Sequence, residues 1–381
     1  MKNTEELQIR NIVKNLYESS VDASYSLAIT GGGIKVVDWL LSVPGASNKI
    51  LEVVLPYSGT SLNKYLGSSI QKSVSLETAS KLANKSYEEA LCNNPDKNNL
   101  VGIGVTASLE TNRFKRSQNK FYMVAKSHEK LFGYSLVFEK GSRDRVLEDQ
   151  ITSKVIISLM YEVLDLKNDF KINLFRKEKL IRYSKLEKLI DQLIQAKKDY
   201  VFIDQSGLAT DDIDFSGVLI PGSFNPLHRG HIGILEYGLK AFGHFDVFFE
   251  LSISNVDKPS LNRDELIDRV RQFRGLSGII ITRSTTFLQK SKLFPGCKFI
   301  VGIDTMERIW DEKYYQSKKD LQDTISDFNE LGVKFFVVGR SNESGDFKSL
   351  SNIEIDERFE KLVSEIPEKD FRVDISSKDL R

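Results

Sequence analysis

The stretch GVLIPGSFNPLHRGHIGIL, residues 217–235, decides the fold of the second half of this 381-residue sequence. It begins as an apolar strand, bends through a loop that contains glycine and proline, and continues as a helix. The sequence contains four histidines, and two of them, His228 and His231, lie in this loop. Ligands bind to open parallel sheets where strands end and helices begin, so the loop is the first candidate for a binding site.

The residue types of this loop suit an anionic ligand. Gly222 and Gly230 let the backbone approach a ligand closely, and the helix N-terminus offers N–H groups and a partial positive charge. His228 and His231 add imidazole donors, so we predict a phosphate-binding loop. Two alternatives remain open: a zinc site, although the i, i+3 spacing has no acidic or cysteine ligand nearby, and a structural loop whose histidines cap backbone groups.

Composition describes a globular protein and excludes several classes. Lys plus Arg (54) nearly equals Asp plus Glu (53), so the net charge does not indicate binding to nucleic acid or to a membrane. Cys92 and Cys297 lie far apart and outside any metal-ligand spacing, which favours a reducing compartment and no metal site. There is no signal-peptide-like run and no long apolar segment. We expect a cytoplasmic protein, with the nucleus as the alternative compartment.

Length predicts two domains, and alternating strand and helix patterns predict the α/β class. We expect domains at 1–166 and 217–381, joined by a connector at 167–216 that contains one amphipathic helix with a docking face. Continuous apolar strands in the second half predict a Rossmann-like, doubly wound parallel sheet. Strands are expected at 25–30, 49–56, 100–108, 120–126, 133–140, 217–221, 246–253, 278–282, 297–303, 334–339 and 371–375. Helices are expected at 75–92, 143–166, 229–242, 262–274, 305–331 and 355–366.

The loop residues 222–231 match the GxFxPxHxGH signature of the HIGH-type nucleotidylyltransferases. Within that superfamily, the second half most resembles the nicotinamide/nicotinate mononucleotide adenylyltransferases. Four further segments resemble this family in the expected order: SISNVDKPSL (252–261), FIVGIDTMERIWDEKYY (299–315), FFVVGR (335–340) and DISSKDLR (374–381). In the last of these, Lys378 stands where the family has threonine.

The resemblance implies that His228 and His231 are the catalytic residues and bind the phosphates of ATP, which enters with Mg²⁺. It implies that Trp310 stacks on a nicotinamide ring, with core packing as the alternative role. It further implies ATP-binding or substrate-binding roles for Gly222, Ser223, Phe224, Lys258, Gly302, Asp304, Trp310, Arg340, Ser376, Ser377 and Arg381.

The segment SVPGASNKILEVVLPYS (42–58) resembles the C-terminal domain of competence-damage-inducible protein A, whose active members are nicotinamide-nucleotide amidohydrolases. The resemblance covers about residues 10–166 and implies an α/β amidohydrolase-like sandwich that forms homo-oligomers. The family's catalytic serine position falls on Thr30, Tyr57 keeps the family spacing, and Leu62 replaces a lysine. A hydroxyl without a base is a poor nucleophile, so we expect a degenerate domain.

The TGGG turn after the first strand could still hold a phosphate, or could be a tight turn that packs a helix on the sheet. For the whole chain we expect transfer of AMP from ATP to nicotinamide or nicotinate mononucleotide. The alternatives are a phosphopantetheine-, choline- or glycerol-type phosphate acceptor, a non-catalytic scaffold that binds nicotinamide nucleotides, and residual deamidation that depends on Thr30.

Overall fold

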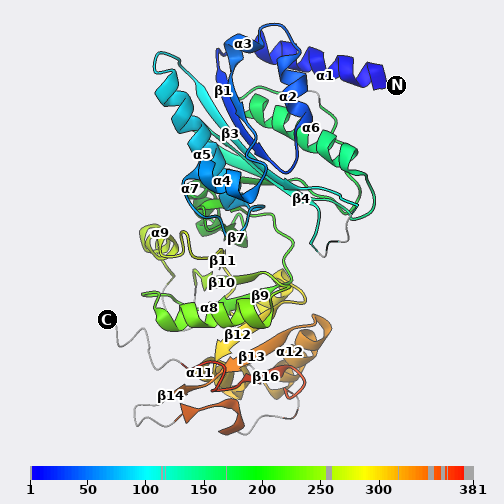
Figure 1. Cartoon of the computed structure of the whole chain (residues 1–381). Helices are drawn as coiled ribbons and strands as arrows, with labels where there is room; N and C mark the ends of the chain where they lie inside the picture. Colours follow the sequence, from blue (N-terminus) through cyan, green and yellow to red (C-terminus); the bar gives the residue numbers. More distant parts are fainter. Residues whose placement is uncertain are drawn as a thin grey trace. The chain divides into compact units, whose positions relative to one another are not determined.

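The chain divides into two compact units, Met1–Lys185 and Leu186–Arg381 (Figure 1). Each unit is an α/β layer structure and is described by itself. The expected connector 167–216 supplies one strand to the first unit, and a helix and two strands to the second. The computed structural model describes residues 2–112, 115, 117–168, 170–254, 260–315, 317–341, 347–352, 357 and 359–372.

The first unit contains a mixed sheet. Strands β2 and β3 pair in parallel with β1, which lies between them, and β3 to β6 continue the sheet as antiparallel neighbours. All seven residues of β1 are buried, as its apolar run predicts. The strands are β1 (Ser24–Thr30), β2 (Ile50–Val54), β3 (Leu100–Ser108), β4 (Lys120–Lys126), β5 (Leu131–Val137) and β6 (Ile181–Lys185).

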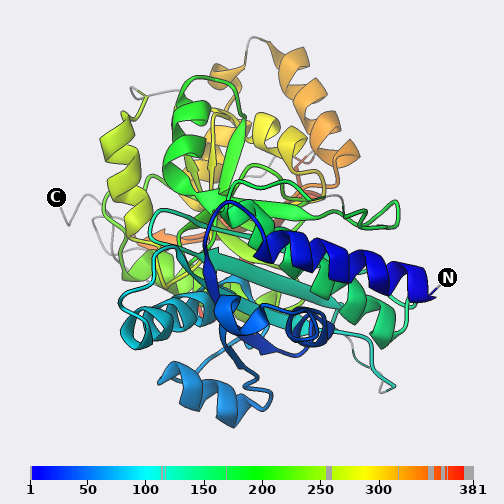
Figure 2. The same ribbon diagram turned by 90° about the horizontal axis from the view of Figure 1, so that it is seen from above.

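Helices cover both faces of this sheet (Figures 1 and 2). On one face, α1 (Lys2–Tyr17) and α2 (Lys35–Leu41) pack with α6 (Arg145–Val163), where the Tyr161 hydroxyl donates to the Ile12 carbonyl at 2.6 Å. On the other face, α5 (Leu76–Asn93) approaches so closely that a Cβ on Gly102 would lie 2.3 Å from the Ala83 carbonyl oxygen. The shorter helices are α3 (Ala46–Lys49) and α4 (Gly59–Leu66).

The second unit contains a doubly wound parallel sheet. Strands β9 (Val218–Pro221), β10 (Val247–Ser252) and β11 (Ile279–Thr282) run outward in one direction. Strands β12 (Lys298–Gly302), β13 (Lys334–Val338) and β16 (Val363–Ile366) run outward in the other. The order β11-β10-β9-β12-β13-β16 therefore reverses between β9 and β12, which is where such sheets bind ligands.

Antiparallel strands extend this sheet beyond β11, a feature that the expectation of a parallel sheet did not include. Strand β7 (Tyr200–Ile203) pairs with β11, and β8 (Leu208–Thr210) pairs with β7. A separate hairpin is formed by β14 (Arg340–Ser341) and β15 (Phe347–Lys348).

Two helical layers enclose the sheet of the second unit. One face packs on α7 (Leu186–Ile194), α8 (Arg229–Ala241) and α9 (Arg263–Arg271), and the amphipathic stripe of α7 lies in this core. The other face packs on α10 (Phe287–Leu293) and α12 (Lys318–Glu330) through an aromatic cluster of Phe287, Phe299, Phe328 and Phe335. Helix α11 (Ile303–Trp310) follows β12, and the 3-10 turns are η1 (Glu312–Tyr314) and η2 (Leu350–Asn352).

The expected helix at 355–366 is wrong, because its last four residues form β16 beside β13. The pattern EIDERFEKLVSEI has helical spacing, but pairing with an open sheet edge outweighs a weak local preference. The expected helix at 305–331 is divided into α11 and α12. Of the expected strand 371–375, Phe371 and Arg372 form no strand and the remainder lies outside the described residues.

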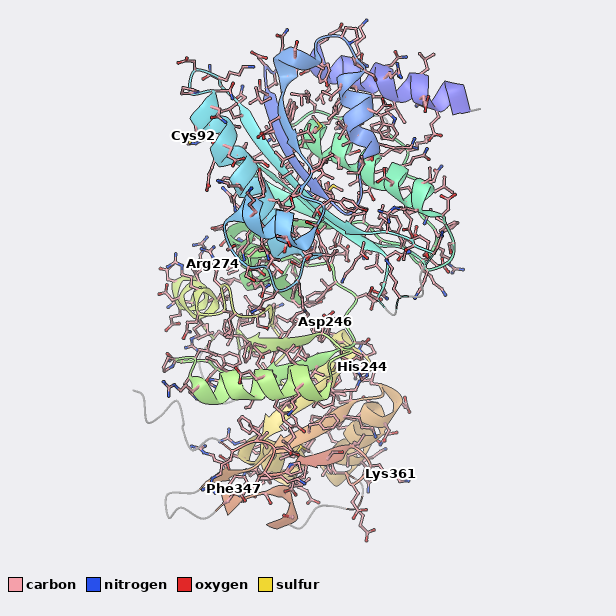
Figure 3. The ribbon with its side chains drawn as sticks, in the orientation of Figure 1. Cys92, His244, Asp246, Arg274, Phe347 and Lys361 are labelled. Carbon is pink, nitrogen blue, oxygen red and sulfur yellow. The ribbon has the colours of Figure 1, made fainter. Side chains whose placement is uncertain are left out.

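Both cysteines are free thiols. Cys92 is exposed on α5 (Figure 3), and Cys297 is buried immediately before β12. Burial raises the pKa of the Cys297 thiol to about 12, which makes it a poor nucleophile. Across the described residues, no helix has both the length and the apolar character that crossing a bilayer requires.

Candidate functional site

The loop that carries both histidines lies at the point where the strand order reverses. It leaves β9 at Gly222 and enters α8 at Arg229. The neighbouring strand β12 ends at Gly302, the residue before α11. The histidine loop and the start of α11 therefore follow two neighbouring parallel strands at the point where the strand order reverses.

The two imidazoles form a stacked pair at the start of α8. Their ring centroids lie 3.7 Å apart with an interplanar angle of 27°. His228 donates its backbone N–H to Nδ1 of His231 at 3.2 Å, so we assign the proton of the neutral His231 ring to Nε2. Burial, followed by the neighbouring His228, lowers the pKa of His231 to about 4. His231 is thus an uncharged Nε2–H donor at neutral pH, and not a cation.

Phe224 fixes the course of the loop. Its side chain is fully buried, and its ring packs edge-on against Phe249, Phe273 and His231. Its backbone is left-handed, with φ of 45°, which is rare for a residue with a side chain. A Cβ on Gly222 would lie 2.6 Å from this ring, so the packing requires glycine there.

Backbone hydrogen bonds tie the loop to the sheet and to α9. Gly222 donates its N–H to the Glu250 carbonyl at 3.0 Å, and Arg269 donates to the Ser223 carbonyl at 2.9 Å. Gln272 binds two loop groups at once: its Nε2 donates to the Phe224 carbonyl at 3.1 Å, and its Oε1 accepts the Leu227 N–H at 2.8 Å. Neither Arg269 nor Gln272 is predicted from the sequence, where their only signal is a shared helix face.

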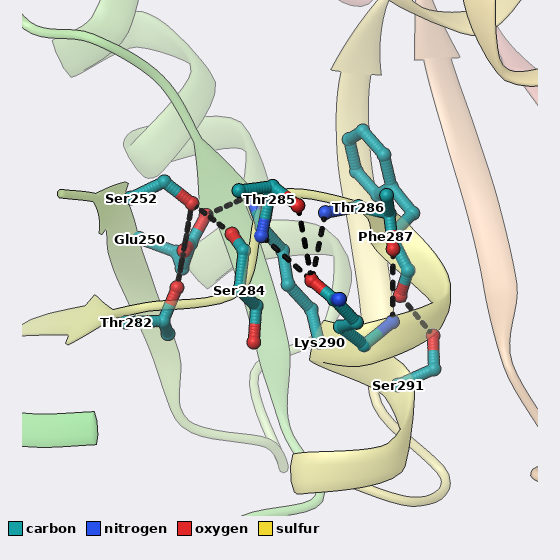
Figure 4. A network of polar contacts seen from close by, with 10 residues as sticks. Glu250, Ser252, Thr282, Ser284, Thr285, Thr286, Phe287, Lys290 and Ser291 are labelled. Carbon is teal, nitrogen blue, oxygen red and sulfur yellow. Dashed lines mark hydrogen bonds and ion pairs between the residues drawn. The ribbon is translucent and has the colours of Figure 1, made fainter. Parts of the chain in front are cut away.

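A buried ion pair connects strand β10 to helix α10 (Figure 4). Lys290 of α10 contacts Glu250 of β10 at 2.6 Å, with side-chain exposures of 8% and 0%. The other carboxylate oxygen of Glu250 accepts from the Thr282 hydroxyl at 2.6 Å. Because the backbone of Glu250 also holds Gly222, this network stabilises the strand from which the histidine loop starts.

The start of α11 brings together two of the predicted residues. Asp304, in the first turn of α11, pairs with Arg340 of β14 at 3.1 Å, and both side chains are about half exposed. One turn later, both carboxylate oxygens of Glu307 accept from Lys348 of β15, at 2.6 and 2.7 Å. Two ion pairs therefore hold the β14–β15 hairpin against α11.

Trp310 is the last residue of α11 and is half-buried. Its ring lies 6.0 Å from that of the fully buried Phe359, so part of the indole contributes to packing within the unit. The remaining predicted residues of this half, Lys258, Ser376, Ser377 and Arg381, lie outside the described residues.

In the first unit, the two predicted residues are engaged by other groups. The Thr30 hydroxyl is buried and donates to the Pro56 carbonyl at 3.0 Å. The exposed Tyr57 hydroxyl accepts from the Arg145 guanidinium at 3.2 Å. Leu62, which replaces the family's lysine, is buried in a small apolar cluster with Ala28 and supplies no base.

The TGGG turn is filled by the protein itself. The Asp149 carboxylate accepts the N–H groups of Gly33, Ile34 and Lys35 at 2.7, 3.1 and 3.1 Å. A Cβ on Gly31, whose φ is 80°, would lie 1.8 Å from the Ala107 carbonyl oxygen. These contacts favour the alternative interpretation, in which the glycines allow a helix to pack tightly on the sheet.

The doubly wound sheet and the glycine-containing loop at its switch point place the second unit among the Rossmann-like nucleotide-binding proteins. The chain belongs to the cytidylyltransferase-like family of nucleotidyltransferases, whose family model matches residues 219–381. It is 33% identical over 114 residues to the phosphopantetheine adenylyltransferase of Mycoplasma capricolum subsp. capricolum. The matched region covers 28% of this chain and 78% of that relative.

Solved structures similar to this chain include a competence/damage inducible protein of Agrobacterium tumefaciens, with a TM-score of 0.36 and 12% identity over 41% of this chain and 96% of that one. A competence-damaged protein (CinA) superfamily protein of Escherichia coli has a TM-score of 0.33 and 13% identity, over 41% of this chain and 90% of that one.

Proposed function

We propose that the second unit transfers AMP from ATP to nicotinamide or nicotinate mononucleotide and releases pyrophosphate. The observation that carries this proposal is the donor group at the start of α8: an uncharged His231 ring with its proton on Nε2, stacked on His228 at the helix N-terminus. A helix N-terminus favours negative charge, and donors fixed before the reaction need no reorganisation when charge develops on phosphate oxygens.

The proposed reaction needs no protein nucleophile. A phosphate oxygen of the mononucleotide attacks the α-phosphorus of ATP, forming a new P–O bond, while the bond from the α-phosphorus to the bridging oxygen breaks. The electron pair leaves with pyrophosphate. His231 and the N-terminus of α8 would stabilise charge on the departing oxygens, and the rate would depend on alignment of the two substrates.

Mg²⁺ would be bound mainly by the phosphates of ATP. Among the residues that the structure describes, no group of three or more His, Cys, Asp or Glu side chains is placed to hold a metal ion. The phosphate oxygens of ATP suit Mg²⁺, which keeps several waters and commonly enters with substrate phosphates. The chemistry that it supplies is charge neutralisation on the triphosphate.

The acceptor side of the proposal depends on the neighbourhood of α11. Asp304 and Arg340 lie at the same sheet edge as the histidine loop and offer polar groups to a ribose or a phosphate. Trp310 offers a ring for stacking, although part of it packs on Phe359. The second candidate acceptor is phosphopantetheine, which is favoured by the identity to a relative that carries that name.

A product assay separates these acceptors. The full chain is incubated with ATP, Mg²⁺ and one acceptor at a time: nicotinamide mononucleotide, nicotinate mononucleotide or phosphopantetheine. We expect a dinucleotide mass with a mononucleotide and equimolar pyrophosphate. A product with phosphopantetheine alone would replace the acceptor assignment. Binding of Mg-ATP without turnover on any acceptor would favour the non-catalytic scaffold.

Trp310 provides a sharper test of the nicotinamide acceptor. Trp310→Leu should raise the KM for the mononucleotide by about tenfold, the value of one stacking contact, and leave the KM for ATP unchanged. The matched control is Tyr314→Leu, which removes an exposed aromatic ring close by in the chain. Equal effects of the two variants would assign Trp310 to packing alone.

For the first unit we propose a non-catalytic binding or assembly role. The Thr30 hydroxyl is already hydrogen-bonded to the Pro56 carbonyl, and Leu62 at the lysine position supplies no base to activate it. Light scattering of the full chain should give a multiple of 43.3 kDa if this unit assembles oligomers. Release of ammonia from nicotinamide mononucleotide that disappears in Thr30→Ala would contradict the non-catalytic role.

A further inference from the structure

Side chains at the end of helix α9 bind the backbone carbonyl groups of the histidine loop. Arg269 in the last turn of α9 and Gln272, the C-cap residue of this helix, donate to the consecutive carbonyls of Ser223 and Phe224, at 2.9 and 3.1 Å. The same Gln272 amide accepts the N–H of Leu227 at 2.8 Å, so a single side chain connects the two ends of the bend between Phe224 and Leu227.

These contacts determine the direction of the loop's N–H groups. In a planar trans peptide, the N–H points opposite to the C=O of the same peptide. Because the carbonyls of Ser223 and Phe224 face α9, the N–H groups of Phe224 and Asn225, which belong to the same two peptides, face away from α9. Two successive N–H groups directed to one side are the arrangement by which backbone concavities bind anions.

The loop conformation needs this support, since Phe224 adopts the left-handed region at φ of 45°. Such a conformation persists only where the surroundings determine it. Helix α9 is a firm support: Asn262 and Glu265 form a reciprocal cap at its start, and Leu266 and Val270 are buried in the core. Its last turn continues into Phe273, whose ring packs 5.1 Å from that of Phe224.

We propose that Gln272 is a positioning residue for nucleotidyl transfer, which orients the loop's N–H groups and the histidine pair toward the triphosphate without touching it. This proposal rests on the proposed function of the second unit. Arg269 acts in the same way on the preceding peptide. The chain segments concerned lie 45 to 48 residues apart, so α9 and the loop form one unit only in the folded protein.

The test compares two substitutions of Gln272. Gln272→Met keeps the approximate shape and removes both hydrogen bonds to the loop, together with the bond from Gln272 Nε2 to the Arg269 carbonyl at 3.2 Å. Gln272→Glu keeps an acceptor for the Leu227 N–H but cannot donate to the Phe224 carbonyl. We expect both variants to lower kcat/KM for ATP by about 10- to 100-fold, the usual effect of displacing reacting groups by about an ångström. Full activity in Gln272→Glu would show that the Phe224 contact is dispensable and overturn the proposal.

A matched control lies one residue earlier on the same helix. Arg271 forms an exposed ion pair with Asp268 at 3.0 Å and contacts no loop group in the described structure. Arg271→Gln should leave kcat/KM unchanged. If all three variants lose activity in proportion to their loss of melting temperature, Gln272 has a structural role only and the proposal fails.

A second readout does not depend on turnover. Histidine NMR titration should show the pKa of His231 near 4 in the native chain and closer to 6.5 in Gln272→Met, because a released loop exposes the ring to water. Mg-ATP should also bind about tenfold more weakly to this variant. If the native chain acts on no acceptor, the proposed function fails, whereas the role of Gln272 is still decided by these two measurements. Native values for both would overturn it.

Discussion

The backbone N–H of His228 is hydrogen-bonded to Nδ1 of His231, and this contact leaves the proton of the His231 ring on Nε2. Burial, and after it the ring of His228 stacked 3.7 Å away, disfavours a charge on His231. His231 therefore provides a directional hydrogen-bond donor and no fixed charge at neutral pH. For transfer between phosphates, such a site can stabilise the transition state without holding pyrophosphate too tightly after the reaction.

His231→Ala should lower kcat by about 10²- to 10³-fold, the usual cost of removing one transition-state donor. The measurement is pyrophosphate release at saturating substrate. His244→Ala is the control, because His244 is exposed, lies three residues beyond the end of α8 and belongs to the same unit. A rate for His231→Ala within twofold of the native rate would remove this imidazole from the mechanism.

The pH dependence of catalysis should reflect a neutral His231. Since its pKa lies at about 4 in the free protein, kcat/KM should show no titration of this residue between pH 5.5 and 7.5. The measurement is kcat/KM for ATP across that range. A protonation step near pH 6.5 that disappears in His231→Gln would show that the imidazole titrates normally and would contradict the neutral-donor description.

His231 should also make stability depend on pH. The unfolded chain binds a proton at His231 below about pH 6.5, and the folded chain only near pH 4, so this contribution to folding is complete above pH 6.5 and is lost as the pH falls to 4. The loss is about 3 kcal/mol, because each pKa unit corresponds to about 1.4 kcal/mol. Urea unfolding between pH 4 and 7 measures it, and His231→Gln should show a weaker dependence.

Lys290→Met should destabilise the second unit by about 3–5 kcal/mol, because it leaves the buried Glu250 carboxylate without its cation. The control is Lys292→Met on the same helix, whose exposed pair with Asp327 should contribute no more than about 1 kcal/mol. Thermal unfolding measures both. Equal stabilities of the two variants would mean that Glu250 is satisfied without Lys290.

Gly31→Ala tests the interpretation of the TGGG turn. The new Cβ would lie 1.8 Å from the Ala107 carbonyl oxygen on a backbone with φ of 80°, so we expect the first unit to lose well over 1 kcal/mol of stability. Gly59→Ala is the control, since no atom lies within 4 Å of its added Cβ. A Gly31→Ala variant as stable as the native chain would show that the turn has room for a ligand.

Sequence patterns predicted the parts of the site that are local in the chain. The bend from Gly222 to His231 contains its own glycines, proline and helix start, so its position after β9 followed from residues 217–235 alone. The contacts of Gln272 and Arg269 could not be predicted, because they join segments more than 40 residues apart and depend on the packing of α9. No local sequence pattern predicts such a contact.

The same reason explains two differences in the fold. Asp149 binds the TGGG turn from a helix more than 110 residues later in the chain. The sequence therefore could not predict that the N–H groups of this turn are hydrogen-bonded to a carboxylate. Residues 363–366 form β16 because β13 offers an open edge, a tertiary effect that outweighs their helical spacing. Strands with continuous apolar runs, such as β1 and β13, were predictable because burial on both faces leaves a direct trace in composition.

Histidine NMR with Mg-ATP tests the central claim most directly, since the chain has only four histidines to observe. We expect the signals of His228 and His231 to shift on addition of Mg-ATP, and the signals of His128 and His244 to stay in place. The pKa of His231 should rise from about 4. Signals of His228 and His231 that remain fixed at saturating Mg-ATP would contradict a triphosphate site at this loop.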